Sequence, residues 1–262
     1  MKDLIRRKKN KSEKKLVCLT AYSKPIAKVL DRHCDIILVG DSVATAFYGM
    51  KDTRSISLGT MIEHAKSVRR SVNKSILVFD MPHHTYRSSE SAKKNVRKVI
   101  KKTHCDAIKL ESNGKNFNII KNLVKSGIPV MGHLGLTPQA VHRFGYRRQA
   151  QDRASQDRLL KQADQLEQAG CFALVLEHVP ADLAKEMCRN LTIPVIGIGA
   201  GEWCDGQVRV TADLLGLTQQ QPPFSPSLLP GRQMFVSALQ DWIQQCRPAA
   251  PTTEEAPQEH DC

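Results

Sequence analysis

The sequence lacks the features of several protein classes. Its eight cysteines include no CxxC pair, and no apolar run approaches the ~18 residues of a membrane span. The basic N-terminus is not followed by the apolar segment of a signal peptide. Scattered cysteines of this kind are typical of free thiols in a reducing compartment. We therefore expect a cytoplasmic protein that makes no membrane contact.

Aromatic and acidic residues are also scarce. Aromatics make up 5% of the chain, and 26 acidic residues against 39 Lys and Arg leave a formal net charge of +13. The positive charges gather in residues 1–15 and 93–102, which raises the hypothesis of a nucleic-acid footprint. No aromatic residues alternate with these charges, and this favours a frayed basic terminus and a solvated helix face. Nucleic-acid binding is therefore not expected, although a positive field would attract anionic substrates.

Short apolar runs dominate what is present. They show no polar alternation, which is typical of strands buried on both faces of a parallel sheet. The predicted strands lie at 16–22, 35–42, 75–82, 107–112, 128–135, 172–180, 193–201 and 207–210. Between most of these runs lie segments whose apolar residues recur at helical spacing, which predicts a helix there. With 262 residues, the chain also has the length of a (β/α)8 barrel. The fold class predicted is α/β, a TIM barrel of parallel strands.

Composition divides the chain into three parts. Residues 1–15 are expected to form a basic N-terminal lead-in, and residues 16–246 a single barrel domain that would carry any active site. The last helical stripe of that domain consists of Phe235, Val236, Leu239, Trp242, Ile243 and Cys246. Residues 247–262 are rich in Pro, Ala, Thr and Glu, and we expect a disordered tail there.

Acidic residues stand at the carboxyl ends of four predicted strands: Asp41, Asp80, Glu111 and Glu177. In a barrel these ends converge on one rim, so residues distant in sequence become neighbours. Crowded carboxylates repel one another unless a cation neutralises them, and oxygen ligands with open positions suit Mg2+. A capping or loop-stabilising role is the alternative for any single acid. Four at equivalent positions favour a functional site.

Two further side chains point to the same rim. Lys109 lies two positions before Glu111, so both face the same side of a strand. Lys109 can hold a substrate carboxylate or a developing oxyanion, or it can simply form an ion pair with Glu111. His133, near the end of the predicted fifth strand, is either a satisfied core histidine or part of the site.

Several motifs resemble the ketopantoate hydroxymethyltransferase family. They occur in order between residues 16 and 217: VGDS (39–42), DMP (80–82), KLE (109–111), GHLGLTPQ (132–139), LEHVP (176–180) and IPVIGIGAG (193–201). The blocks at 132–139 and 193–201 are highly specific together. The resemblance implies a (β/α)8 barrel that makes ketopantoate in the pantothenate and coenzyme A pathway and assembles as a homo-oligomer, a decamer.

The resemblance also implies a role for most of the candidate residues. Asp41, Asp80 and Glu111 are expected to bind Mg2+. His133 is not among the residues the resemblance assigns; if it belongs to the site, we expect it to contact the metal ligands instead of the metal. The 2-oxo acid substrate is expected to contact Asp41, Ser42, Asp80 and Lys109. Glu177 is expected to be the catalytic proton acceptor, and 5,10-methylenetetrahydrofolate the co-substrate that supplies the carbon unit.

Two alternative functions remain open at this point. A related Mg2+-dependent barrel could cleave or rearrange 2-oxo acids without folate. A diverged paralogue without catalysis could act as a binding protein. The loop at 144–150, altered in that it is one glycine shorter than the usual pattern of the family, motivates this second hypothesis. Retention of all four acidic positions argues against it.

Overall fold

The computed structural model describes residues 1–9, 14–112, 114–140, 147–219 and 221–247. Within them, eight parallel strands close into one barrel in sequence order, and β1 pairs with β8. The strands are β1 (Leu16–Thr20), β2 (Ile36–Val39), β3 (Ile76–Asp80), β4 (Ala107–Glu111), β5 (Val130–Gly135), β6 (Ala173–Glu177), β7 (Val195–Ile198) and β8 (Gly206–Arg209). The predicted barrel of parallel strands is confirmed.

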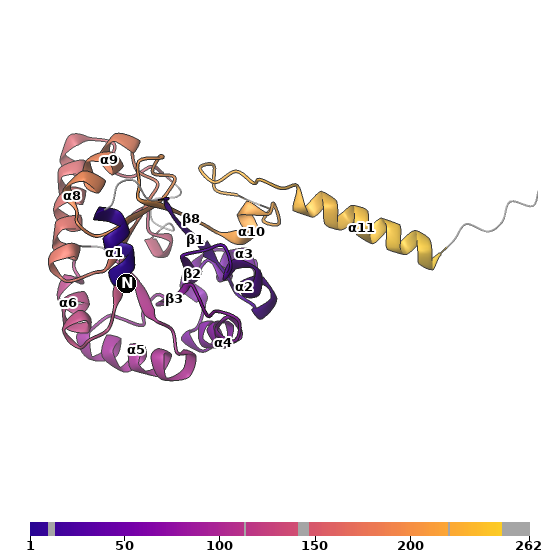
Figure 1. The fold of residues 1–262 in the computed structure, drawn as a ribbon, viewed down its shortest axis with the longest axis horizontal. Coiled ribbons are helices and arrows are strands. Elements are labelled where there is room, and N and C mark those ends of the chain that lie inside the picture. Colours follow the sequence, from indigo (N-terminus) through magenta and orange to yellow (C-terminus); the bar gives the residue numbers. More distant parts are fainter. Residues whose placement is uncertain (10–13, 113, 141–146, 220, 248–262) are drawn as a thin grey trace, which may run out of the picture.

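The described helices lie around this barrel, except for the last, which extends away from it (Figure 1). They are α1 (Lys2–Lys9), α2 (Lys24–Leu30), α3 (Val43–Ala46), α4 (Leu58–Arg69), α5 (Ser89–Thr103), α6 (Phe117–Lys125), α8 (Arg153–Gln168), α9 (Ala181–Asn190), α10 (Thr211–Leu214) and α11 (Gly231–Cys246), with 3-10 turns η1 (Thr53–Ser55) and η2 (Pro138–Ala140). No helix in the described ranges is long and apolar enough to cross a membrane. The predicted tail lies outside the described residues apart from Arg247, and so do residues 144–146 of the altered loop.

Most of the strands are apolar because they bury both faces, although β8 is more polar and partly exposed. In β2, Ile37 and Val39 belong to the larger core between the sheet and the helices, whereas Ile36 and Leu38 belong to a smaller core inside the barrel. Side chains alternate across a strand, so neighbouring residues enter different cores. This explains why the sequence shows continuous apolar runs instead of alternation.

The basic N-terminus is a helix that covers the amino-terminal mouth of the barrel. Leu4 is buried in the inner core. Lys8 Nζ lies 2.6 Å from Asp205 Oδ2 just before β8, and Arg7 forms an ion pair with Asp35 just before β2. Two of the basic charges therefore hold α1 on the barrel, which the frayed-terminus interpretation did not anticipate.

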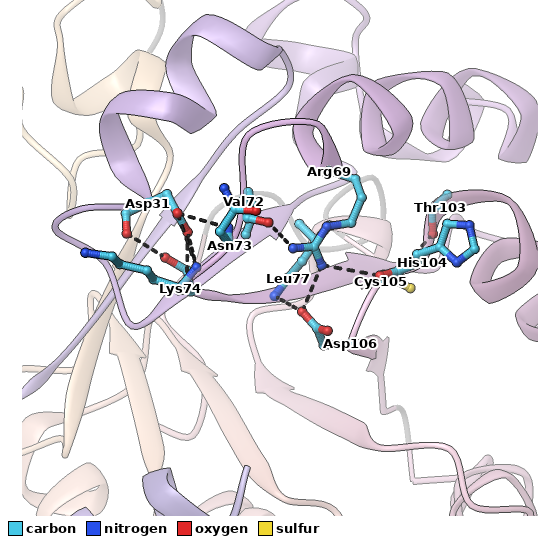
Figure 2. Close-up of polar contacts among 11 residues, drawn as sticks. Asp31, Arg69, Val72, Asn73, Lys74, Leu77, Thr103, His104, Cys105 and Asp106 are labelled. Atoms are coloured by element: carbon cyan, nitrogen blue, oxygen red, sulfur yellow. Dashed lines mark hydrogen bonds and ion pairs between the residues drawn. The ribbon is translucent and has the colours of Figure 1, made fainter.

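Two aspartates order the connections that enter β3 and β4 (Figure 2). Asp31 accepts backbone N–H bonds of 2.9–3.0 Å from Asn73, Lys74 and Ser75. Burial alone would raise the pKa of Asp31, but the hydrogen bonds from these donors outweigh burial, so the pKa lies below its ordinary value. Asp106 Oδ2 accepts the N–H of Leu77 at 2.8 Å. These contacts hold the start of β3, and through it the position of Asp80 at its end.

Helix α11 extends away from the barrel as the yellow helix of Figure 1. Its predicted apolar stripe is exposed: Phe235 keeps 70% and Trp242 60% of its accessible surface. Gly231 is its one buried residue among those described. The stripe therefore has the composition of a core-facing surface, but it is not buried against any core that the described residues form.

Candidate active site

The four predicted carboxylates lie at one end of the barrel. Asp41 follows β2, and the last residues of β3, β4 and β6 are Asp80, Glu111 and Glu177. The first three acids are buried, whereas the side chain of Glu177 keeps 12% of its accessible surface. Because the strands are parallel, their carboxyl ends share one rim, as the sequence predicted.

Strand register places Lys109 opposite Asp80. Lys109 Nζ donates to Asp80 Oδ2 at 2.7 Å, and both side chains are at most 5% exposed. Burial alone would lower the pKa of Lys109, but the nearby carboxylates outweigh burial, so the pKa lies above its ordinary value. Lys109 therefore remains a cation, and its hydrogen-bonded partner is Asp80 instead of the Glu111 considered from the sequence.

The two carboxylate oxygens of Asp80 differ in their hydrogen bonds. Oδ1 is buried and makes no hydrogen bond within the described residues, while Oδ2 is shared by Lys109 and, at 3.5 Å, the N–H of Asp41. Burial, opposed by Lys109 and reinforced by Asp41, raises the pKa of Asp80 to about 7. An unpartnered buried carboxylate oxygen is costly, and a proton or a metal cation would relieve that cost.

His133 lies between two of the acids. Its Nε2 is 3.2 Å from Glu177 Oε2 and its Nδ1 is 3.9 Å from Glu111 Oε1, although neither ring nitrogen has a hydrogen-bond partner among the described residues. Burial and the charge of Lys109 hold the pKa of His133 well below its ordinary value. The imidazole is therefore neutral and adds no charge to the rim.

The carboxyl group of Glu177 has a pKa well above that of an ordinary glutamate. Burial raises its pKa to about 8, the charge of Lys109 opposes that rise, and Asp41 and Asp80 add to it. Gly135 lies opposite Glu177 in the β5–β6 register with φ of +90°, and a Cβ there would approach the Glu177 carbonyl oxygen to 2.1 Å. Only glycine therefore fits beside the backbone of Glu177.

Ser42 lies on the same rim, next to Asp41. Its hydroxyl is 2.8 Å from the hydroxyl of Tyr22, which follows β1, and Ser42 is partly exposed. Burial, opposed by the hydrogen bond from Ser42, raises the pKa of Tyr22 above its ordinary value, so the phenol stays protonated. Tyr22 can therefore donate to Ser42 and leave the serine hydroxyl free to donate elsewhere.

Sequence reasoning did not select Gln139 as a site residue. It is buried after β5, and its side-chain amide donates to Asp41 Oδ2 at 2.9 Å. Its backbone N–H donates to Glu111 Oε1 at 3.2 Å. The one signal in the sequence was its place as the last residue of the motif at 132–139.

The donor set suits a hard cation in charge and in atom type. Asp41, Asp80 and Glu111 offer carboxylate oxygens, and burial raises the pKa of Glu111 well above its ordinary value, with Asp41 and Asp80 adding to the rise. Within the described residues, no three His, Cys, Asp or Glu side chains are already gathered as a metal site. Mg2+ usually takes one or two carboxylates together with water and substrate oxygens, so a preformed cage is not required.

Comparison with known proteins decides the family. The family model described as ketopantoate hydroxymethyltransferase matches residues 1–251. The chain belongs to the ketopantoate hydroxymethyltransferase family. It is an enzyme, a hydroxymethyltransferase of pantothenate biosynthesis, which decides against the hypothesis of a binding protein without catalysis.

Members of the ketopantoate hydroxymethyltransferase family resemble the chain over nearly its whole length. The 3-methyl-2-oxobutanoate hydroxymethyltransferase of Parasynechococcus marenigrum is 51% identical and covers 97% of both chains. The enzyme of the same name from Pelagibacter ubique is 50% identical over 82% of this chain and 83% of its own.

Solved structures show a likeness of fold only. A phosphonopyruvate hydrolase in complex with oxalate and Mg2+ has a TM-score of 0.65 at 13% identity, covering 97% of this chain and 92% of its own. A 2,3-dimethylmalate lyase has a TM-score of 0.57 at 16% identity, covering 98% and 92%. Their barrels support the fold assignment, and at this identity they do not favour the lyase or mutase alternative.

Proposed function

We propose that the chain transfers a hydroxymethyl group from 5,10-methylenetetrahydrofolate to 3-methyl-2-oxobutanoate and so forms 2-dehydropantoate (ketopantoate). The observation that carries this proposal is the buried rim where Lys109 faces Asp80 while Asp80 Oδ1 has no partner among the described residues. In a chain of this family, that rim matches an anionic 2-oxo acid and a divalent cation in charge.

The chain's own residues divide into two groups on this proposal. Asp41, Asp80 and Glu111 would hold Mg2+, which when bound would draw electrons from the keto group and acidify the proton on C3. Lys109 and Ser42 would hold the 2-oxo acid: the ammonium offers positive charge to its carboxylate, and the serine hydroxyl offers a hydrogen bond.

Glu177 would accept the proton from C3. Its pKa of about 8 makes the carboxylate a stronger base than an exposed glutamate. The electron pair left on C3 would then form a bond to the methylene carbon of the folate as the bond from that carbon to N10 breaks. Water would replace N5 on the same carbon and supply the hydroxyl oxygen. Tetrahydrofolate would leave with the proton from C3 and one proton from water on its two nitrogens. Neutral His133, 3.2 Å from Glu177, would support this carboxylate and the candidate metal ligands without adding a charge.

Turnover with defined substrates tests the proposal. The protein with 3-methyl-2-oxobutanoate, 5,10-methylenetetrahydrofolate and Mg2+ is expected to yield 2-dehydropantoate, measured by mass spectrometry, and omission of any one component should stop product formation. Failure to form this product would overturn the proposal. Breakdown of the 2-oxo acid without folate would instead support the lyase or mutase alternative.

We also propose a cytoplasmic homo-oligomer. The seven cysteines in the described ranges are free thiols, which supports a reducing compartment. The apolar stripe of α11 supports self-association, because large exposed apolar side chains that share one helix face are typical of subunit interfaces. The decamer implied by the family resemblance stays a prediction.

A charge on the α11 stripe is expected to reduce the oligomer to smaller species. Phe235→Asp combined with Trp242→Asp places two carboxylates on that stripe, and analytical ultracentrifugation reports the change in mass. Gln244→Asp, on the opposite face of the same helix, is the control and should leave the mass unchanged. An unchanged mass in the double variant would exclude α11 from the interface.

A further inference from the structure

Gln139 connects three strand ends through one side chain. Its Nε2 donates to Asp41 Oδ2 at 2.9 Å and to the carbonyl oxygen of Met81 at 3.1 Å. Its Oε1 accepts the hydroxyl of Tyr86 at 2.7 Å. The side-chain amide therefore uses both N–H donors and its oxygen on protein groups.

We propose that Gln139 is a positioning residue that presents Asp41 to the divalent cation, and that Tyr86 fixes the amide in the orientation this requires. The inference rests on the proposed function, because it takes Asp41 to be a metal ligand. Gln139 would act through Asp41 and would not itself touch substrate or metal.

The three partners leave the amide only one workable orientation. If the amide were flipped, its oxygen would face two further acceptors, Asp41 Oδ2 and the Met81 carbonyl oxygen, and the Tyr86 hydroxyl would lose its acceptor. Gln139 is 4% exposed, so water cannot easily replace those bonds. The orientation of the amide is therefore specified by its surroundings before any ligand binds.

An amide donor suits this task better than a cation. Lys109 neutralises Asp80, whereas the N–H of Gln139 directs one oxygen of Asp41 and leaves its negative charge available. The backbone N–H of Gln139 also holds Glu111 Oε1 at 3.2 Å. One residue of the segment after β5 thus orients two of the three candidate ligands, which stand at the ends of β2 and β4. Groups that orient metal ligands in this way commonly tune metal affinity.

Mn2+ binding measured by electron paramagnetic resonance tests the inference without turnover. Gln139→Ala is expected to weaken Mn2+ binding by about 10- to 100-fold. Tyr86→Phe removes one hydroxyl and is expected to weaken it by about 2- to 10-fold, the effect of one hydrogen bond. Because Tyr86 acts through Gln139, the double variant should bind Mn2+ no more weakly than Gln139→Ala alone. Saturating Mg2+ should restore most of kcat in either single variant.

The control is Asn122→Ala, which removes an amide that donates to Ser89 Oγ at 3.1 Å between the outer helices α6 and α5 and not to a candidate ligand. It should bind Mn2+ like the wild type. Should Gln139→Ala fail to fold, Tyr86→Phe carries the same prediction with a smaller change. Wild-type affinity in Tyr86→Phe and Gln139→Ala, or additive losses in the double variant, would overturn the inference. If the wild type itself binds no Mn2+, the proposed metal ligands are wrong and the inference falls with them.

Discussion

Glu177→Gln is expected to lower kcat by about 100- to 10,000-fold, the range that a positioned general base contributes. Glutamine has nearly the same size but cannot accept a proton, so the variant should fold and bind the 2-oxo acid normally. Exchange of the C3 proton of 3-methyl-2-oxobutanoate with deuterated solvent, followed by NMR without folate, isolates this step. The exchange should disappear in the variant.

The pH dependence provides a second test of Glu177. A base with a pKa of about 8 gains activity as pH rises, so wild-type kcat/KM should rise with pH and level off near or below pH 8, because a bound cation favours the ionised form. Glu63→Gln, at an exposed position on α4, is the matched control and should keep wild-type rates. Deuterium exchange at the wild-type rate in Glu177→Gln would assign the proton transfer to another group.

Lys109→Met is expected to destabilise the fold by about 3–5 kcal/mol at pH 8, as is typical when one partner of a buried ion pair is removed. The variant leaves Asp80 buried without its cation 2.7 Å away, so at pH 8 its carboxyl must either stay charged at a high cost or take up a proton. Chemical denaturation followed by circular dichroism measures the change. The variant should also lose affinity for the anionic 2-oxo acid.

The pH dependence of the stability loss in Lys109→Met distinguishes loss of the ion pair with Asp80 from loss of side-chain packing. The pKa of Asp80 is about 7, above its ordinary value, so the folded state retains a proton that the unfolded state releases between about pH 4 and 7. At pH 5 Asp80 is neutral, and removal of Lys109 should cost less than at pH 8. Lys66→Met, which removes the exposed pair with Glu63, should leave stability unchanged within error. An equal loss at both pH values would point to packing instead of charge.

Much of the site was predictable because it follows from local pattern. Asp80 and Glu111 end apolar runs, and in a parallel barrel every such end lies on the same rim. Likewise, Lys109 and Glu111 share a face because side chains alternate along a strand. These inferences need only the period of a strand and the rule that parallel strands point the same way.

The hydrogen-bond partners of the site residues were harder to predict than their positions on the rim. Lys109 lies two residues from Glu111 in sequence, but the β3–β4 register sets it opposite Asp80, 29 residues earlier. Gln139 reaches Asp41 across 98 residues, and nothing in its local sequence marks it as buried. Such contacts depend on how whole strands align, which no local pattern encodes.

The sequence by itself determined the parallel barrel and the gathering of Asp41, Asp80, Glu111 and Glu177 on one rim, because both follow from the spacing of apolar and acidic residues. Only the tertiary structure decided that Lys109 binds Asp80, that Gln139 donates a hydrogen bond to Asp41, and that the apolar face of α11 is left exposed. The physical reason is that hydrogen-bond partners and burial depend on contacts between segments far apart in the chain. An apolar stripe in the sequence shows only that a helix face tends to be buried, not which surface buries it.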